Sequence, residues 1–250
     1  MHRLPVSLVA AVLAMSAMGP SAAAAKTADE ILVEADRLTN GWSDVFMRTT
    51  MTITDIDGTQ KSYVYCIYQK GLKRLIRFES GELKGMATMV LEDGKVYAYL
   101  PGFKKVRRVA AHNMGQSFAG SDFSNDDLAF TSWPGTYVAR IEREDDDFWY
   151  LRCTPKAGGS RPPYPQAIAR VDKKNQQMMG YTFLDEAGNK IKTFDLRNLK
   201  DWGGGALRTQ VIEVTDDRSG HKTRLDLSEF KVNQGLKDAL FTERELEWGR

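Results

Sequence analysis

The chain has 250 residues, with 35 basic and 33 acidic side chains and a formal net charge of +2. This near-balance argues against a nucleic-acid-binding protein, which usually concentrates an excess of Lys and Arg. Hydrophobic residues make up 42% of the chain, so it can bury a core as one large β domain or two small ones.

The first 25 residues have the features of a signal peptide. The positively charged sequence MHR precedes an apolar stretch from Leu4 to Met18, and small residues follow in GPSAAAAK. We expect an Ala-x-Ala cleavage site that ends at Ala25, and no lipoprotein-type cysteine lies near it. No other apolar run approaches the roughly 18 residues that span a bilayer. Residues 1–25 are therefore expected to be removed, and residues 26–250 to form one periplasmic domain.

One helix is expected directly after the cleavage site. Thr27 and Glu30 have the spacing of a capping box. Apolar residues then recur at helical spacing through ILVEADRL, and Asn40-Gly41 supplies a stop signal.

From Val45 the pattern changes to an alternation with period two, which is typical of β-strands. Turns such as DIDG, KKNQ and DEAGN join the successive segments. The segments are VFMRTTMTI, KSYVYCIYQK, LKRLIRFES, GMATMVLEDG, KVYAYLP, KKVRRVA, TYVARIERED, DFWYLRCTPK, QAIARVDKK, MMGYTFLDEAG, NKIKTFDLRNL, ALRTQVIEVTD and HKTRLDLSEF. GLKDALFTERELE closes the chain as a turn and a short helical tail. The sequence thus predicts a mainly β fold, in which roughly eleven or twelve strands form a single curved antiparallel sheet, an open barrel.

The stretch AHNMGQSFAGSDFSNDDLAF combines a histidine, serines and aspartates, as a catalytic loop does. A serine hydrolase would need Ser117 in a G-x-S-x-G turn between a buried parallel strand and a helix. Ala119 replaces the last glycine, and the preceding KKVRRV segment is charged. His112 lies five residues before the serine. We interpret Ser117 as a loop residue and expect no catalytic residue here.

No spacing in the sequence is typical of a metal or cofactor site, and neither is expected. His112 and His221 lie far apart, and the acidic run Glu144–Asp147 lacks the order of a calcium loop. WGGGAL leads into a strand-like segment rather than a helix. Cys66 and Cys153 each lie in a strand-like run, so a disulfide and two buried thiols both remain open.

The early strands are apolar and aromatic on both faces, as in SYVYCIY, whereas a sheet with one wet face carries polar residues there. Methionines, which adapt to variable apolar partners, are frequent in these strands. Such residues form either an ordinary barrel core or the concave wall of a cavity for an acyl chain. On the second interpretation the cavity residues are Met47, Met51, Tyr63, Tyr65, Ile76, Phe78, Met89, Leu91, Tyr97 and Tyr99.

The basic segment KKVRRV, beside LPGF, suggests either a solvated edge strand or a contact surface. Lys105, Arg107 and Arg108 would then contact lipid headgroups or an acidic partner.

The segment that follows is interpreted as a lid. Ser124 is expected to cap a short helix, with Asp127 completing a variant of the capping box. Four apolar residues would dock toward the barrel mouth: Phe118, Phe123, Leu128 and Phe130.

The run VYAYLPGFKKVRRVAAHNMGQSFAGSDFSNDDLAF resembles a segment of LolA-like periplasmic proteins, the outer-membrane lipoprotein-sorting proteins, in a broader and less characterised branch. The matching features are Leu100-Pro101, Lys105–Arg108, Gly120–Ser124 and Asp127-Leu128. The run QAIARVDKKNQQMMGYTFLDEAGNKIKTF fits two hairpins of that family. The likeness extends over nearly the whole chain after the signal peptide.

The resemblance implies an open barrel of about eleven strands with helices at its mouth, and a non-enzymatic carrier for lipid or lipid-modified protein. Such a carrier, a monomer, would meet an inner-membrane transporter and an outer-membrane acceptor. The arginine that latches the lid in the better-known carrier has no motif match here and is not assigned. The alternative is a periplasmic adaptor or regulatory module that binds an envelope protein, a transporter or stress sensor, through a filled barrel and an exposed apolar or basic patch.

Overall fold

The computed structural model describes residues 25–130, 132–158 and 162–248. The expected signal peptide falls almost entirely on residues 1–24, outside the described residues, so its cleavage after Ala25 stays a prediction. Within the described part, no helix has the length and apolar character needed to cross a bilayer.

The described residues contain thirteen strands in one antiparallel sheet, which confirms the mainly β, open architecture. Each of the strand-like segments of the sequence forms one strand, so the expected number was slightly too low. The strands are β1 (Val45–Thr54), β2 (Gln60–Lys70), β3 (Lys73–Phe78), β4 (Ala87–Val90), β5 (Val96–Leu100), β6 (Lys105–Arg108), β7 (Tyr137–Glu144), β8 (Phe148–Pro155), β9 (Gln166–Asp172), β10 (Met178–Leu184), β11 (Lys190–Asp201), β12 (Leu207–Asp216) and β13 (Lys222–Val232).

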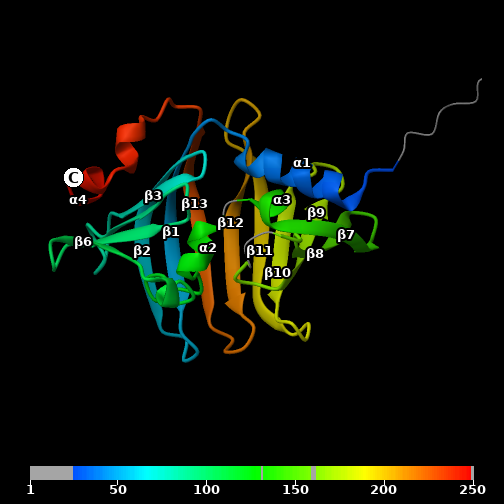
Figure 1. Cartoon of the computed structure of the whole chain (residues 1–250), viewed down its shortest axis with the longest axis horizontal. Helices are drawn as coiled ribbons and strands as arrows, with labels where there is room; N and C mark the ends of the chain where they lie inside the picture. The colour runs from blue at the N-terminus through cyan, green and yellow to red at the C-terminus, as the bar shows by residue number, and fades with distance from the viewer. Residues whose placement is uncertain (1–24, 131, 159–161, 249–250) are drawn as a thin grey trace, which may run out of the picture.

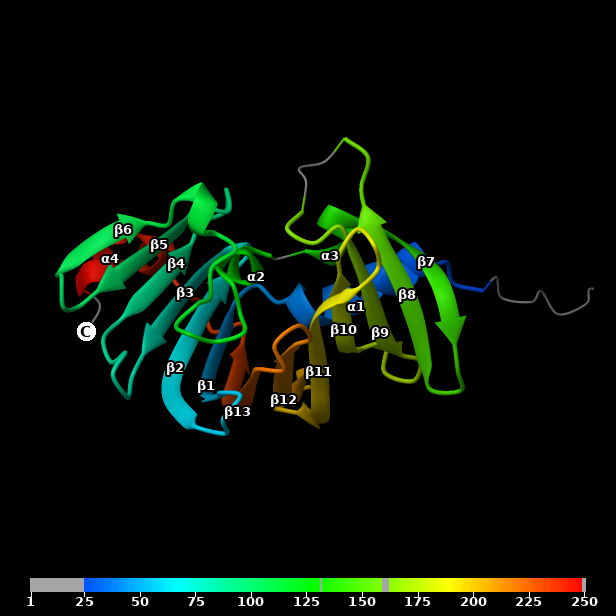
Figure 2. The ribbon, with the colours of Figure 1, turned by 90° about the horizontal axis from the view of Figure 1, so that it is seen from below.

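The order of the strands explains where the chain crosses the mouth of the sheet. The sheet runs β6-β5-β4-β3-β2-β1-β13-β12-β11-β10-β9-β8-β7, so its two edges, β6 and β7, are consecutive in sequence. The connection between them, whose described residues are 109–130 and 132–136, therefore runs from one edge of the curved sheet to the other. Figure 2 shows the sheet curved around an open side, with α2 and α3 of this connection lying between the two arms. We call residues 109–130 the lid segment.

The helices are short apart from the first. They are α1 (Ala28–Asn40), η1 (Ala111–Asn113), α2 (Asn125–Ala129), α3 (Trp133–Thr136), η2 (Asp238–Phe241) and α4 (Glu243–Trp248). The predicted capping box of α1 is confirmed, because the side chain of Thr27 accepts from the Glu30 amide and Glu30 reaches back to the Thr27 amide. The apolar face of α1 packs on β7, β9, β10 and α3, and Figure 1 shows α1 lying across that half of the sheet.

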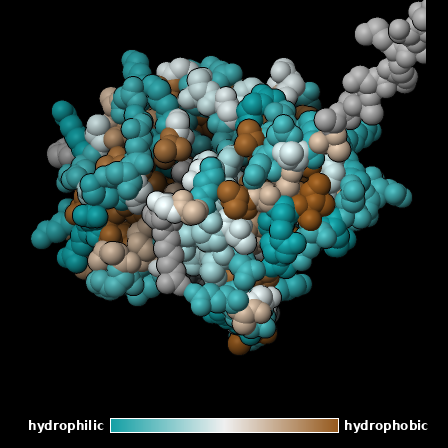
Figure 3. Space-filling view, turned by 45° about the vertical axis from the view of Figure 1, so that its right-hand side comes forward, coloured by the Kyte–Doolittle hydropathy of each residue, from teal (hydrophilic) through white to brown (hydrophobic). Residues whose placement is uncertain are grey.

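The C-terminal tail covers the convex face of the early strands. Phe241 and Leu246 are buried against Leu75, Ala87 and Met89. This packing is the reason why the early strands are apolar on both faces, since one face lines the inside of the sheet and the other receives the tail. The face of the molecule seen in Figure 3 is largely hydrophilic, with apolar residues in separate small groups.

Candidate functional site

A cavity of about 210 Å³ lies between the concave face of the sheet, helix α1 and the lid segment. The strands contribute mainly apolar side chains to its wall, among them Met47, Ile67, Leu196, Ile212, Leu225 and Leu227. Helix α1 contributes Ala35, Asp36, Thr39 and Asn40 from its C-terminal half. The concave face of the sheet thus forms one wall of the cavity, and helix α1 and the lid segment form the opposite wall.

The residues expected to form this cavity separate into three groups. Met47, Tyr65 and Ile76 line the cavity. Met51, Tyr63 and Phe78 pack beside it, in a buried cluster with Phe118. Met89, Leu91, Tyr97 and Tyr99 lie on the opposite face of the sheet, against the C-terminal tail.

The expectation for these last four residues needs correction. The register pairs Met89 with Leu75 and with Tyr97, whereas Ile76, one residue further along β3, belongs to the concave face. Period-two alternation separates a strand into two faces but does not say which face is concave. Because both faces are buried here, the sequence offered no polar face as a guide.

All four expected lid residues, Phe118, Phe123, Leu128 and Phe130, lie on the cavity wall. Phe123 packs edge-on against Phe194, with ring centroids 5.7 Å apart, and Phe130 packs edge-on against Trp133 at 5.1 Å. The cap of α2 is confirmed, because the Asp127 amide donates to Ser124 Oγ at 3.1 Å and the Ser124 amide donates to Asp127 Oδ2 at 2.7 Å. The cap of α2 thus forms between residues close in sequence, and aromatic packing holds the lid segment against the concave face of the sheet.

Polar contacts fasten the lid segment to both halves of the sheet. On one side, the Asp127 carboxylate accepts hydrogen bonds from Lys192 Nζ at 2.6 Å and from the Tyr164 hydroxyl at 2.9 Å. Near the centre, Asp122 accepts from the Thr223 hydroxyl at 2.7 Å and lies 2.8 Å from His221 Nδ1. The lid is therefore joined to β11 and to the start of β13.

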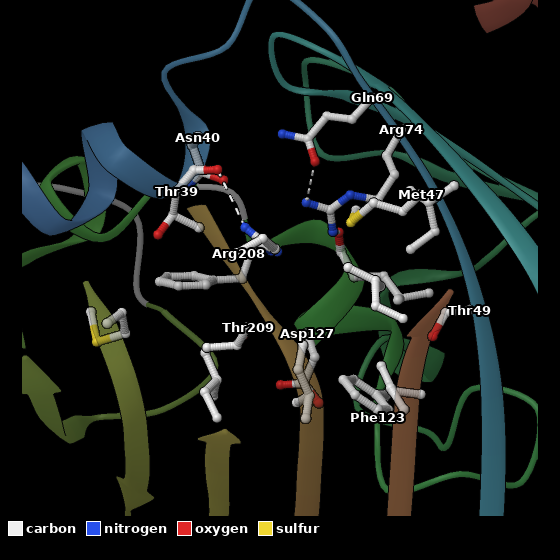
Figure 4. Close-up of a pocket in the computed structure, with 18 of the residues that line it drawn as sticks. Thr39, Asn40, Met47, Thr49, Gln69, Arg74, Phe123, Asp127, Arg208 and Thr209 are labelled. Atoms are coloured by element: carbon white, nitrogen blue, oxygen red, sulfur yellow. Dashed lines mark hydrogen bonds between the residues drawn. The ribbon is translucent and has the colours of Figure 1, made fainter. Parts of the chain in front are cut away.

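Arg74 joins the lid to the other half. It lies on β3 and donates to the carbonyl oxygen of Leu128 in α2 at 2.9 Å, and to Gln69 Oε1 at 3.2 Å. Figure 4 shows its guanidinium group pointing into the cavity rather than to the outside. The Arg74 guanidinium therefore joins β3 to α2 through a backbone carbonyl.

A second arginine, Arg208 on β12, also points into the cavity (Figure 4) and donates to the carbonyl oxygen of Thr39 at 3.3 Å. Burial, and after it the positive charge of Arg208, lower the pKa of Arg74 to about 10. Burial also lowers the pKa of Arg208. Neither arginine was predicted from the sequence to line the cavity. For Arg74 a signal was available, because alternation places it on the same face of β3 as Ile76 and Phe78.

The two carboxylates on the cavity wall have other partners. Asp127 is paired with Lys192, as described above. Asp36 accepts from the Trp133 amide at 3.2 Å and from Asn40 Nδ2 at 3.0 Å, and burial raises its pKa. Within the described ranges, no ion pair joins either carboxylate to Arg74 or Arg208.

Ser117 has a structural contact rather than a catalytic one. Its hydroxyl donates to the carbonyl oxygen of Ser121 at 2.6 Å, and His112 is exposed at η1. His221 lines the same shallow pocket as Ser117, but its two ring nitrogens face carboxylates, Asp122 at 2.8 Å and Asp55 at 3.2 Å. Burial opposes protonation of His221, but the hydrogen bond and charge of Asp122, with Asp55, raise its pKa above the ordinary value. Both ring nitrogens of His221 thus face carboxylates, so neither is directed at a serine hydroxyl.

The basic residues Lys105, Arg107 and Arg108 are exposed on β6, at the free edge of the sheet. Arg107 lies over the ring of Phe103, 5.9 Å from its centroid, and Phe103 is itself 68% exposed. The edge thus presents cations beside an exposed aromatic ring.

Cys66 and Cys153 are free and buried, on β2 and β8 respectively. Those strands belong to opposite halves of the sheet. Of the two alternatives open from the sequence, the structure therefore selects buried thiols.

A protein-family model described as an uncharacterized protein matches residues 70–248. No curated protein matches the chain in sequence. Three solved structures share its fold. A domain from Vibrio parahaemolyticus named for outer membrane lipoprotein sorting covers 88% of this chain and 98% of its own, at 21% identity and a TM-score of 0.78. A DUF1329 family protein from Desulfovibrio piger covers 87% and 97%, at 23% identity and a TM-score of 0.78. A LolA superfamily protein from Nitrosomonas europaea covers 88% and 100%, at 22% identity and a TM-score of 0.73.

Proposed function

We propose that this chain is a non-enzymatic periplasmic carrier. It belongs to the family whose model matches residues 70–248, and it shares the fold of the outer membrane lipoprotein-sorting domain and of the LolA superfamily protein. It binds the acyl chain of a lipid or lipoprotein in the cavity and moves it between the membranes of the envelope. An inner-membrane transporter would supply the cargo, and an outer-membrane acceptor would receive it.

The observation that carries the proposal is the cavity between the concave face and the lid segment. Its wall is mainly apolar, with Met47, Ile212 and Leu225 among its residues, so it can hold a chain by non-directional burial. Each buried methylene contributes about 0.8 kcal/mol, so a sixteen-carbon chain gains on the order of 10 kcal/mol before ordering costs. That gain is sufficient for capture without any covalent step.

The size of the cavity indicates that loading requires movement of the lid. A volume of about 210 Å³ is below the roughly 300–1,000 Å³ of common ligand sites. Helix α2 has only five residues and is held by side-chain contacts rather than by strand pairing. The bond from Arg74 to the Leu128 carbonyl and the contact between Asp122 and His221 can break while the sheet stays intact. Opening the lid would widen the cavity and expose its apolar wall to an acceptor.

The basic edge of the sheet is the proposed contact surface for delivery. Lys105, Arg107 and Arg108 are exposed on β6 beside Phe103, and cations next to an exposed aromatic ring suit an anionic membrane surface or an acidic partner. The exposed edge of a strand also offers backbone groups for pairing.

Native mass spectrometry of protein purified without detergent tests the proposal directly. We expect a population with an added mass in the range of a lipid, and binding of a fluorescent fatty acid after that lipid is removed. Protein that carries no lipid and binds no fluorescent fatty acid would contradict a carrier function.

A second candidate function is an adaptor that binds another envelope protein. The exposed edge strand β6, with Phe103 beside it, favours this alternative. Crosslinking in cells from a photoreactive residue at position 103 separates the two, because an adaptor gives one stoichiometric protein partner whether or not the cavity is filled. A carrier gives crosslinks that depend on cargo.

A further inference from the structure

Two arginines line the cavity without a carboxylate to balance them. Arg74 uses its guanidinium for the Leu128 carbonyl and Gln69, and Arg208 uses its own for the Thr39 carbonyl. In the part of the chain that the structure describes, neither group forms an ion pair with Asp or Glu. Two more polar atoms of the cavity residues, Arg74 Nε and Thr209 Oγ1, are buried and have no hydrogen-bond partner among the described residues.

Two buried, unpaired guanidinium groups cost free energy when no ligand is bound. A buried charge is normally paired, because removing it from water costs several kcal/mol. The like charge of the second arginine adds to this cost, as the lowered pKa of Arg74 indicates. The nearby acids do not compensate, since Asp127 is paired with Lys192 and burial raises the pKa of Asp36. The cavity therefore carries an excess of positive charge beside unused donors.

We propose that Arg74 and Arg208 bind the anionic head group, a carboxylate or a phosphate, of a single-chain amphiphile whose tail occupies the apolar part of the cavity. The inference rests on the proposed carrier function and names its ligand class. The guanidinium group suits both anions, because its planar N–H donors match their oxygen pairs. Arg74 Nε and the Thr209 hydroxyl then gain the partner that they lack.

The placement of the residues gives the ligand a direction. In Figure 4, Gln69, Arg74 and Asn40 lie toward the top of the view, Arg208 lies below them near the middle, and Phe123 lies toward the bottom. The head group would lie between the arginines, close to the end of α1, and the chain would extend toward Phe123 and the Ile212 and Leu225 side chains. A volume of about 210 Å³ favours one chain over two. The acylated cysteine of a lipoprotein carries several chains and no anionic group there, so it matches this site less well than a fatty acid does.

Calorimetric titration of the delipidated full chain with dodecanoate, dodecyl phosphate and dodecanol tests the inference, because the three ligands share a tail and differ in the head group. We expect both anions to bind at least about tenfold more tightly than the alcohol, because each anion gains one or more charge-assisted hydrogen bonds. The ratio between dodecanoate and dodecyl phosphate identifies which anion the site prefers.

The variants Arg208→Met and Arg74→Met should each weaken binding of the anions by about tenfold and leave dodecanol nearly unchanged. Arg74 also holds the lid, so Arg74→Lys, which keeps the charge, should retain part of the anion preference. The matched control is Arg140→Met on the exposed face of β7, which should not alter any affinity. Circular dichroism and thermal unfolding verify that each variant is folded, and Arg208→Lys replaces Arg208→Met if the latter is not.

The outcomes separate the two proposals. Equal affinity for dodecanoate and dodecanol, or an equal loss in Arg140→Met, overturns the anion site and leaves the carrier function standing. Failure of the wild-type protein to bind any of the three ligands overturns the carrier function itself.

Discussion

Lys192 on β11 places its ammonium nitrogen 2.6 Å from Oδ2 of Asp127 on α2, and the two side chains are only 8% and 5% exposed. The pair joins a strand of the sheet to the helix of the lid segment. Lys192 Nζ also lies 5.7 Å from the centroid of the Tyr164 ring, which stacks on Phe183 with ring centroids 3.9 Å apart. The Tyr164 hydroxyl completes the network. The closed position of the lid thus depends on a buried ion pair between elements far apart in sequence.

Breaking this pair should be costly. Lys192→Met leaves Asp127 buried without its counter-charge, and we expect a loss of about 3–5 kcal/mol in the free energy of unfolding. Urea denaturation measures it. Removing both charges in Lys192→Met with Asp127→Asn should recover part of the loss. The control is Lys231→Met, whose partner Glu229 lies at an exposed site, and which should cost about 1 kcal/mol or less. Equal losses at the two sites would show that the buried pair has no special role.

His221 should make the attachment of the lid dependent on pH. Its pKa is raised in the folded protein, because Asp122 and Asp55 outweigh the effect of burial. A raised pKa means that the stabilisation is fully present below the unfolded value of about 6.5 and is lost as the pH rises through the folded value. The difference in melting temperature between the wild type and His221→Gln should therefore be largest at about pH 5–6 and shrink toward alkaline pH. A difference that is constant with pH would contradict this account.

Filling the cavity should block binding without unfolding the protein. Leu196 is half-buried on the cavity wall, and Leu196→Trp places a larger ring in the space. We expect the affinity for a fluorescent fatty acid to fall about tenfold or more, with stability unchanged or slightly raised, since filling a cavity commonly adds about 0.5–2 kcal/mol. Leu72→Trp, at an exposed turn, is the matched control and should bind normally. Unaltered binding by Leu196→Trp would place the ligand elsewhere.

The two cysteines should react only after unfolding. Burial, and for Cys66 also the carboxylate of Glu79, raises the pKa of both thiols to about 12. A thiol-specific chromogenic reagent should detect no fast-reacting group in native protein at neutral pH and two in urea. The absence of titratable thiols in urea without reductant would instead reveal a disulfide.

The basic edge should direct the protein to anionic membranes. Charge reversal by Arg107→Glu together with Arg108→Glu should weaken sedimentation with phosphatidylglycerol vesicles by at least about tenfold, because each cation near such a surface contributes about 1 kcal/mol. Phosphatidylcholine vesicles serve as the neutral comparison. Arg140→Glu on β7 with Lys156→Glu directly after β8, both at exposed positions, reverses the same charge elsewhere. If both double variants lose binding equally, net charge rather than the β6 edge governs it.

Features that depend on near neighbours in the chain could be predicted from the sequence alone. The capping boxes of Thr27 with Glu30 and of Ser124 with Asp127 need only a spacing of three residues, and both are present. The strands follow from alternation within each segment, and the antiparallel sheet follows from the short turns between them. The apolar lid residues were recognisable for the same reason, because a short capped helix after a basic strand is a local pattern.

The concave face of each strand, and the polar groups that share the cavity, could not be predicted from the sequence and follow from the three-dimensional fold. Alternation does not distinguish Ile76 from Met89. In the structure, however, Met89 packs against the C-terminal tail on the convex face, and Ile76 lies on the concave face. Arg74 and Arg208 lie on strands that are separated in the sheet by β2, β1 and β13. They face one cavity because the sheet curves, and curvature arises from pairing among strands distant in the chain. Burial and unpaired charge are properties of that assembled geometry, and no local pattern in the chain encodes them.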